Sequence, residues 1–315
     1  MQKQDILDCH LRIKPYVHNT PVLTSGLVNE LVGAELYFKC ENFQRAGAYK
    51  IRGATNAILK LSASQRTKGV VTHSSGNFAQ AVSLAAKSLG IPAHIVMPTS
   101  APKVKKIGVE QYQGIIYECE PTLEARQAMA DKIATETGAT FLHPSNDLNV
   151  IVGQGTAALE LLENRPDLNF IFCPVGGGGL IAGSALSAHY FGKNCNVFGG
   201  EPFEADDAYR SLKTGKIEGN DTVNTIADGL KTTLGDVNFP IIKKYVSKIV
   251  RVTEEEIISA MRLVWERMKV IIEPSSAVTV AAVLRDARES PYSYKDKKVG
   301  IVISGGNVDL DNLPF

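Results

Sequence analysis

The chain has no cluster of basic residues interleaved with aromatic residues, and its formal net charge is only +1. A nucleic-acid groove needs many lysines and arginines to neutralise phosphates, so we expect no nucleic-acid partner. No apolar run approaches the roughly 20 residues that span a bilayer, so we expect no membrane-spanning segment. The first ten residues, MQKQDILDCH, carry charges and lack an apolar core, so we expect no secretory signal.

The chain is also poor in cysteine. The five cysteines are spread widely and form no Cys-x-x-Cys pair. We therefore expect neither a disulfide framework nor a structural zinc site, and a reducing, cytoplasmic location is the simplest expectation. Cys40 and Cys173 lie in apolar stretches and should be core residues. There is no internal repeat and no low-complexity tract, and 315 residues suffice for about two domains.

Short strand-like segments alternate with helical patterns along the chain. Apolar positions at helical spacing predict helices over Asn77–Leu89 and Glu254–Met268, and Thr253 with Glu256 forms a capping box for the second. This alternation predicts an α/β fold with mostly parallel sheets, which bind ligands beyond the carboxyl ends of their strands. The predicted strands are 36–40, 69–72, 94–97, 115–119, 170–175, 196–199 and 299–303.

Four consecutive glycines stand between an apolar strand and a predicted helix in PVGGGGLIAGSALSA, residues 174–188. Glycines allow backbone N–H groups to turn inward together, and a helix N-terminus adds the positive end of its dipole. The pattern predicts an anion cradle suited to phosphate, although a tight strand–helix turn is the simpler alternative. No Gly-Lys-Ser/Thr follows, and Ile181 breaks the Gly-x-Gly-x-x-Gly spacing of a dinucleotide site. The glycines are Gly176, Gly177, Gly178 and Gly179.

Two further strand ends carry small polar residues. In THSSGNFAQA, Ser74, Ser75 and Asn77 could hold a carboxylate or a ring oxygen, or could simply cap the following helix. In ISGGNVDL, Ser304 could bond a heterocycle nitrogen without carrying charge, or could belong to an ordinary strand and turn.

Lys50 lies in ENFQRAGAYKIRGA between Gly47 and Gly53. A lysine that forms a Schiff base needs a lowered pKa, which burial provides, and a backbone that lets a bulky group approach. A solvated surface lysine is the commoner case, and Lys50 alone would be read that way. One ligand with a phosphate and an aldehyde, pyridoxal phosphate, would explain the glycine cradle, the strand-end serines and Lys50 together.

These motifs, with GQGT at 153–156 and TIADG at 225–229, resemble those of the fold-type II pyridoxal-phosphate enzymes. The similarity runs from Thr20 to Leu310, and CEPTLEAR, EPFEADDAY and LVWERMKVIIEP resemble eukaryotic-type serine racemases most. The resemblance implies two open, mostly parallel twisted sheets flanked by helices, as in the tryptophan synthase β-like fold. It implies a large cofactor-binding domain, residues 1–68 plus 149–315, and a small mobile domain, residues 69–148. It also implies a homodimer, and we expect no C-terminal regulatory domain.

The resemblance implies a role for each motif residue. Lys50 resembles the Schiff-base lysine, and Ser75 the acid/base on the opposite face of the substrate. The small amino-acid substrate would be bound by Ser74, Ser75, Asn77 and Arg126. The cofactor would be bound by Lys50, Tyr49 beside the ring, Asn77 at the phenolic oxygen, Gly176 to Gly179 at the phosphate and Ser304 at the ring nitrogen.

EPFEADD, residues 201–207, would be a solvated acidic loop if it were judged alone. The resemblance instead implies a divalent-cation site formed by Glu201, the carbonyl of Ala205 and Asp207. Oxygen ligands with waters suit Mg²⁺ or Ca²⁺, with Mn²⁺ as a further candidate. A nucleotide activator such as ATP is a further expectation from the family.

The resemblance predicts a serine racemase that interconverts L- and D-serine and also eliminates water to give pyruvate and ammonia. The alternative is a dedicated ammonia-lyase (dehydratase) for L-threonine and L-serine or for threo-3-hydroxyaspartate. The sequence departs from the family at Ala48 and Phe78, where serine and histidine are usual, and at Ser145, where vertebrate serine racemase has asparagine, so the exact substrate stays open. A nucleotide-dependent oxidoreductase is disfavoured by the glycine spacing, and a non-catalytic binding protein by Lys50 and Ser75.

Overall fold

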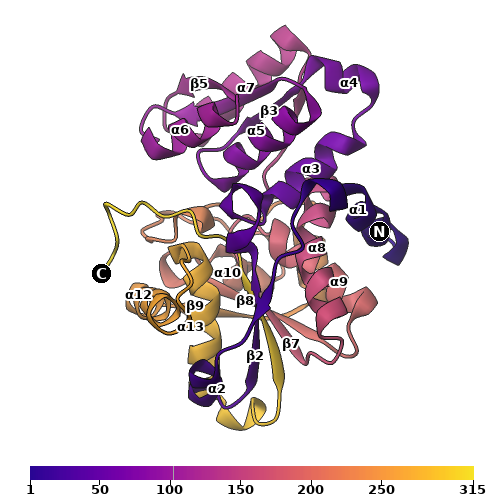
Figure 1. The fold of residues 1–315 in the computed structure, drawn as a ribbon. Helices are drawn as coiled ribbons and strands as arrows, with labels where there is room; N and C mark the ends of the chain where they lie inside the picture. Colours follow the sequence, from indigo (N-terminus) through magenta and orange to yellow (C-terminus); the bar gives the residue numbers. More distant parts are fainter. Residues whose placement is uncertain (102) are drawn as a thin grey trace.

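The computed structural model describes residues 1–101 and 103–315, which form two helix-flanked sheets (Figure 1). The helices are α1 (Lys3–Ile13), α2 (Gly26–Val32), α3 (Lys50–Lys60), α4 (Ala63–Lys68), α5 (Asn77–Leu89), α6 (Lys103–Gln111), α7 (Leu123–Thr137), α8 (Leu148–Asn164), α9 (Gly179–Phe191), α10 (Asp207–Thr214), α11 (Phe239–Tyr245), α12 (Glu254–Leu263) and α13 (Pro274–Glu289). Short 3-10 turns lie at Lys14–Tyr16, Glu41–Phe43, Arg45–Gly47, Phe203–Ala205, Asp228–Leu230 and Pro291–Ser293.

The strands form a six-stranded sheet of order β1-β2-β10-β7-β8-β9 and a four-stranded sheet of order β5-β4-β3-β6. All neighbouring strands are parallel except β1 and β2. The strands are β1 (Val22–Leu23), β2 (Glu35–Cys40), β3 (Val70–His73), β4 (Ala93–Pro98), β5 (Ile115–Cys119), β6 (Thr140–Phe141), β7 (Phe170–Pro174), β8 (Asn196–Pro202), β9 (Val246–Val252) and β10 (Lys298–Ile303).

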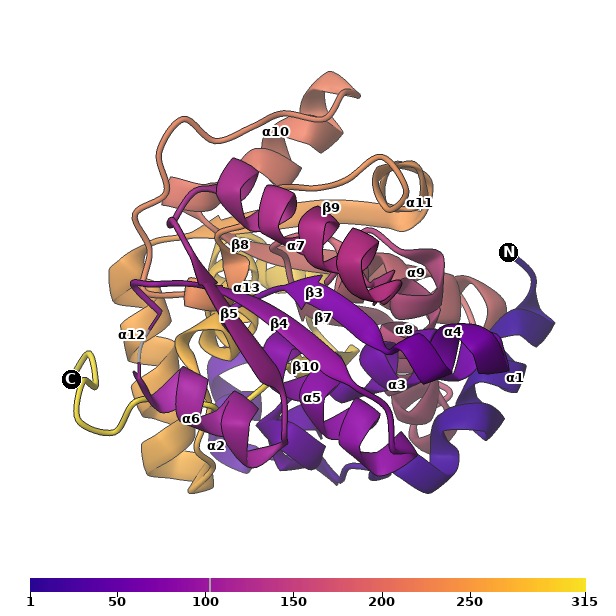
Figure 2. The same cartoon turned by 90° about the horizontal axis from the view of Figure 1, so that it is seen from above.

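Helices cover both faces of each sheet. On the six-stranded sheet, α8 and α9 pack with α1 in one apolar core, and α2, α12 and α13 pack on the opposite face in another. On the four-stranded sheet, α5 and α6 lie on one face and α7 on the other (Figure 2). Both faces are therefore apolar, which explains why the central strands are almost fully buried.

Local signals explain where several helices begin and end. The side chain of Asp147 caps α8 by accepting from the N–H groups of Asn149 and Val150. The predicted capping box of Thr253 and Glu256 is present at the start of α12. The helix predicted over Glu254–Met268 is α-helical to Leu263 and then widens into a π-helical turn, Val264–Met268.

The α/β fold with two open, mostly parallel sheets is confirmed, and every predicted strand is present within two or three residues of its expected ends. The sequence reading missed β1, β6 and β9. The predicted core positions of Cys40 and Cys173 are confirmed, because both are fully buried. All strands of the smaller sheet come from residues 70–141, and the division into domains at 69–148 stays a prediction. None of the described helices is both long and apolar enough to cross a membrane.

Candidate active site

The segments that follow β2, β10 and β7 leave the six-stranded sheet at one edge. These strands are adjacent and parallel, with Ile303 paired to Cys40 and Ile301 to Phe172. The turn after β10 contacts the segment before α3, since the Tyr49 N–H donates to the Ser304 carbonyl at 3.0 Å. Two predicted motifs that are more than 250 residues apart in sequence thus meet at this edge.

Lys50 is the first residue of α3, and its side chain is partly buried. Its Nζ donates a hydrogen bond to the carbonyl oxygen of Pro144 at 2.9 Å. The same nitrogen lies 5.1 Å from the ring centroid of Tyr49 and 5.7 Å from that of Phe78. Burial lowers the pKa of the Lys50 amine to about 8, although the negative charge of Glu273 opposes this shift. The amine therefore loses its proton more readily than that of an exposed lysine, whose pKa is about 10.4.

The four glycines form a backbone turn with no space for side chains. Gly178 has a φ of +79°, and α9 begins at the next residue, Gly179. A Cβ at Gly176 would lie 2.8 Å from the Leu230 backbone, and one at Gly177 would lie 2.4 Å from the Ser145 hydroxyl. The start of α9 thus has free-standing backbone N–H groups and no side chains on the glycine turn, which we call the glycine cradle, and this donor set fits a phosphate group.

Asn238, which the sequence reading missed, fixes this turn. Its Nδ2 donates to the Gly177 carbonyl at 2.8 Å and to the Ser145 carbonyl at 3.1 Å, and its side chain is fully buried. A single amide therefore ties the glycine turn to the segment that follows β6. No local pattern around Asn238 signals this role, since its partners are 61 and 93 residues away.

Asn77, at the start of α5, forms hydrogen bonds with Glu273, which precedes α13, and with Asn307, which follows β10. Its Nδ2 donates to the carboxylate of Glu273 at 2.9 and 3.1 Å, and its Oδ1 accepts from Asn307 at 2.9 Å. Burial raises the pKa of Glu273 to about 7, and the negative charge of Asp228 adds to the shift. The sequence reading assigned roles to neither Glu273 nor Asn307.

Ser304 is buried directly after β10. Its Oγ lies 2.9 Å from the Oγ of Ser276, which also accepts from the Gly305 N–H at 2.7 Å. The serine pair is uncharged, so it can hydrogen-bond a ring nitrogen without forcing a proton onto it.

The predicted substrate residues are less tightly bound within the chain. Ser74 Oγ accepts from the Gly76 N–H at 3.4 Å, and Ser75 is partly exposed with no side-chain hydrogen bond to any described residue. Arg126 lies on α7, where its Nε donates to the Thr122 carbonyl at 3.2 Å and its charge faces His73. No contact joins Arg126 to Lys50 in the described part of the chain.

Two carboxylates of EPFEADD are fully buried, so the reading of this segment as a solvated acidic loop is wrong for them. Glu201 accepts from the N–H groups of Ala208 and Tyr209, and Asp207 from Leu234 N–H and Asn220. Their pKa values are raised by burial, for Asp207 to about 6, and Asp207 further raises that of Glu201. The intervening Ala205 is also fully buried, in the turn Phe203–Ala205.

This donor set fits a divalent cation. Two buried, mutually repelling carboxylates are costly without a compensating charge, and an oxygen-binding cation supplies one. Within residues 1–101 and 103–315, no three His, Cys, Asp or Glu side chains cluster into a metal site, so carbonyl oxygens and water would complete the shell.

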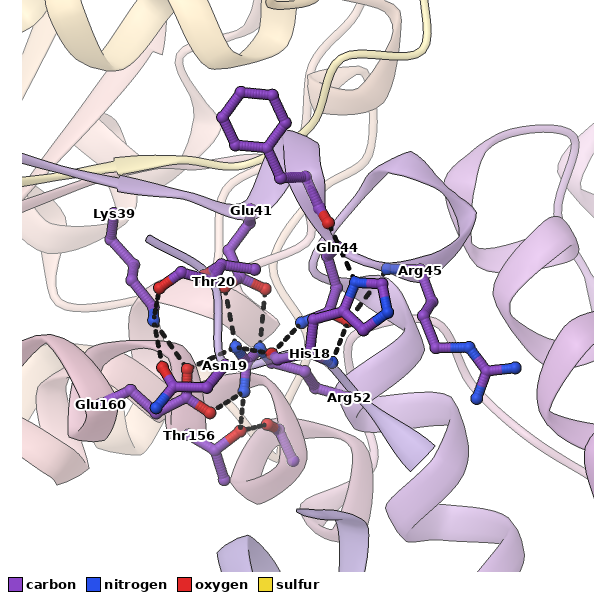
Figure 3. A network of polar contacts seen from close by, with 12 residues as sticks. His18, Asn19, Thr20, Lys39, Glu41, Gln44, Arg45, Arg52, Thr156 and Glu160 are labelled. Carbon is purple, nitrogen blue, oxygen red and sulfur yellow. Dashed lines mark hydrogen bonds and ion pairs between the residues drawn. The ribbon is translucent and has the colours of Figure 1, made fainter. Parts of the chain in front are cut away.

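A buried network of charges lies beside the start of α3 (Figure 3). Arg52 donates to both oxygens of Glu41 and both oxygens of Glu160, at 2.7 to 2.8 Å. Lys39 donates to Glu160 at 2.7 Å and to the Thr20 carbonyl at 2.8 Å. The network joins β2, α3 and α8, so it fixes the helix whose first residue is Lys50.

The three departures from the family pattern all lie near these groups. Ala48 pairs with Gly305 in an isolated β-bridge, and Phe78 is buried with its ring facing the Lys50 amine. Ser145 places its hydroxyl at the cradle beside Gly177. Ala48 and Phe78 have no hydrogen-bonding side-chain group, whereas Ser145 has its hydroxyl beside the glycine turn.

Comparison with known proteins decides the family. Residues 13–305 match the model described as "Pyridoxal-phosphate dependent enzyme". The chain belongs to this family of enzymes. The fit of the family's cofactor rests on the glycine cradle and on Lys50, whose pKa is lowered to about 8.

Similar members of the family span nearly the whole chain. A β-hydroxyaspartate dehydratase of Paracoccus denitrificans is 47% identical over 99% of this chain and 98% of its own. A serine racemase of Dictyostelium discoideum is 49% identical over 98% of this chain and 96% of its own. The solved structure of maize serine racemase has a TM-score of 0.96 at 46% identity, covering 98% of this chain and 94% of that one. The chain is thus a pyridoxal-phosphate-dependent enzyme of the racemase and dehydratase group.

Proposed function

We propose that this enzyme is a serine racemase that also eliminates water from serine to give pyruvate and ammonia. Two groups support the proposal: the Lys50 amine, whose pKa is lowered, and the Ser75 hydroxyl, which forms no hydrogen bond with any described residue. Ser75 lies two residues before Asn77, which is itself bound to Glu273. Racemisation needs a proton-transfer group on each face of the α-carbon, and this pair supplies two.

When bound, pyridoxal phosphate draws electrons from the substrate α-carbon and makes its proton removable. Gly176 to Gly179 would hold its phosphate, and Ser304 its ring nitrogen. Lys50, whose amine has a lowered pKa, would take the α-proton on one face. Ser75 delivers or removes a proton on the other face, while the SSGN segment holds the substrate carboxylate.

A dehydratase acting on a hydroxyaspartate is the second candidate. It is favoured by the 47% identity to the Paracoccus denitrificans β-hydroxyaspartate dehydratase, which is close to that of the racemases. A second substrate carboxylate requires a cation, and Arg126 on α7 is the candidate side chain.

A chiral assay of the holoenzyme separates these candidates. We expect D-serine to accumulate from L-serine, and Ser75→Ala to abolish this while the cofactor spectrum persists. Wild-type racemisation by Ser75→Ala would refute the role of Ser75. Turnover of threo-3-hydroxyaspartate without D-serine formation would favour the dehydratase. Borohydride reduction followed by peptide mapping tests Lys50, and a reduced adduct on another lysine would refute the central assignment.

We also propose a divalent-cation site at Glu201, Ala205 and Asp207, on the support of the two buried carboxylates. A mobile small domain over residues 69–148, a homodimer and activation by ATP remain proposals from the family resemblance. Limited proteolysis with and without serine tests the first, sedimentation velocity tests the second, and the rate of serine turnover with and without ATP tests the third.

A further inference from the structure

The side-chain amide of Gln154, on α8, lies between two parts of the candidate site. Its nitrogen faces Pro144, and its oxygen faces the start of α9. Its Nε2 donates to the Pro144 carbonyl at 3.2 Å, and Lys50 Nζ donates to the same carbonyl oxygen at 2.9 Å. Its Oε1 would lie 2.5 Å from a Cβ at Gly179, where the glycine cradle becomes α9. The amide therefore lies between the reacting amine and the cradle.

The Oε1 atom is buried, and no described residue donates a hydrogen bond to it. A buried acceptor without a donor is costly, so a ligand, an ordered water or a second side-chain arrangement is expected to supply its partner. Gln154 itself is fully buried, which excludes bulk water as the ordinary partner.

An anion in the cradle changes which end of the amide is favoured there. An oxygen acceptor beside a phosphate is repelled, whereas an N–H donor forms a charge-assisted hydrogen bond. The terminal torsion of a glutamine is soft and roughly two-fold, so half a turn exchanges the two ends. After that turn Nε2 faces the anion and its hydrogen bond to Pro144 is lost. Oε1 then lies beside the Pro144 carbonyl oxygen, and the repulsion between these two acceptors is offset when the Lys50 amine donates to both.

We propose that Gln154 is a positioning residue that couples occupancy of the glycine cradle to the placement of the Lys50 amine. With the cradle empty, Pro144 holds the amine alone and Gln154 supports that carbonyl. With an anion bound, the turned amide gives the amine a second, neutral acceptor. The inference rests on the proposed role of Lys50 as the reacting amine.

The test uses apoprotein of wild type, Gln154→Glu and Gln154→Met. Two quantities are measured: the dissociation constant of inorganic phosphate by calorimetry, and the pH midpoint of imine formation with pyridoxal. In Gln154→Glu we expect phosphate affinity to fall at least about tenfold and the midpoint to rise by about one pH unit, because a carboxylate beside an ammonium raises its pKa. In Gln154→Met, which has similar volume and no donor, we expect phosphate affinity to fall about fivefold.

The matched control is Ser184→Ala, which removes another buried polar group, on α9, that has no contact with Lys50 among the described hydrogen bonds. It should leave both quantities unchanged. The titratable groups around the Lys50 amine, Glu273, His143 and Tyr49, are untouched in every variant.

Phosphate affinities within twofold of wild type in both Gln154 variants would overturn the proposal, as would an equal loss in Ser184→Ala. If Gln154→Glu does not fold, the phosphate affinity of Gln154→Met decides. Absence of an imine at Lys50 in the wild type would refute the proposed function instead. The phosphate measurement does not depend on that result.

Discussion

Replacing Glu160 with glutamine should remove a large part of the stability of this enzyme. Glu160 accepts three hydrogen bonds of 2.7 Å from two cations, Arg52 and Lys39, and all three side chains are at most 2% exposed. Glutamine keeps one acceptor oxygen but removes the charge, so two buried cations would share the single carboxylate of Glu41. Breaking a buried ion pair from one side typically costs about 3–5 kcal/mol. We expect a loss of about 3 kcal/mol in the free energy of unfolding.

Urea titration of the holoenzyme measures this loss, and two further variants show its cause. Glu163→Gln, one turn further along α8 on an exposed side chain, should change stability by no more than about 0.5 kcal/mol. The double variant Lys39→Met with Glu160→Gln leaves Arg52 and Glu41 as a balanced pair. It should therefore lose at least about 1 kcal/mol less than the sum of the single losses. Strictly additive losses would refute the reasoning from charge balance.

The same residue predicts a pH dependence. Burial alone would raise the pKa of Glu160, but hydrogen bonds and charges from Arg52 and Lys39 outweigh it and hold the pKa below its ordinary value. A carboxyl whose pKa is lowered by folding stabilises the protein above its unfolded pKa of about 4.3, and the stabilisation is lost as pH falls through the folded value. The difference in the free energy of unfolding between wild type and Glu160→Gln should therefore shrink as the pH falls below about 4. A constant difference down to pH 2 would contradict this.

Three further outcomes are expected. Millimolar Mg²⁺ should raise the melting temperature of wild type but not of Asp207→Asn, and an equal rise in both would place the cation elsewhere. Gly179→Ala, whose Cβ would lie 2.5 Å from Gln154, should cost about 1–3 kcal/mol and weaken cofactor binding, whereas Gly26→Ala, with no atom within 4 Å, should not. Three of the five cysteines, Cys9, Cys40 and Cys173, are buried, and burial raises the pKa of each thiol to about 12. At pH 8 a thiol reagent should therefore modify these three only after denaturation.

Much of the fold could be predicted from the sequence because its signals are local. Strand and helix periodicity gave the main elements, and the glycine run marked the turn into α9. The missed strands β1 and β6 have two residues each, too short for alternation to show. β9 lies in a segment of mixed burial between two helices, where the sequence reading recognised only α12.

The candidate site could be predicted less well from the sequence, because its contacts join residues that are far apart along the chain. Glu273 and Asn77 are 196 residues apart, and neither the caps nor the periodicity around them reveals that they meet. The orphaned oxygen of Gln154 and the anchoring amide of Asn238 depend on the approach of the segment after β6 to the glycine turn. From sequence alone, the segment with Glu201 and Asp207 would be predicted to be a surface loop, because nothing local shows that both carboxylates are buried.

Lys50 and Arg52 show why such partners decide function. They lie two residues apart at the start of one helix, and burial alone acts to lower the pKa of both. Arg52 faces Glu41 and Glu160, whose charges and hydrogen bonds outweigh burial and keep it charged. Among the residues that the structure describes, Lys50 has the neutral Pro144 carbonyl as its one direct acceptor, so burial prevails. Moving a carboxylate to the Pro144 end of Lys50 would therefore remove its basic reactivity without changing a catalytic residue, since a paired ammonium cannot take an α-proton.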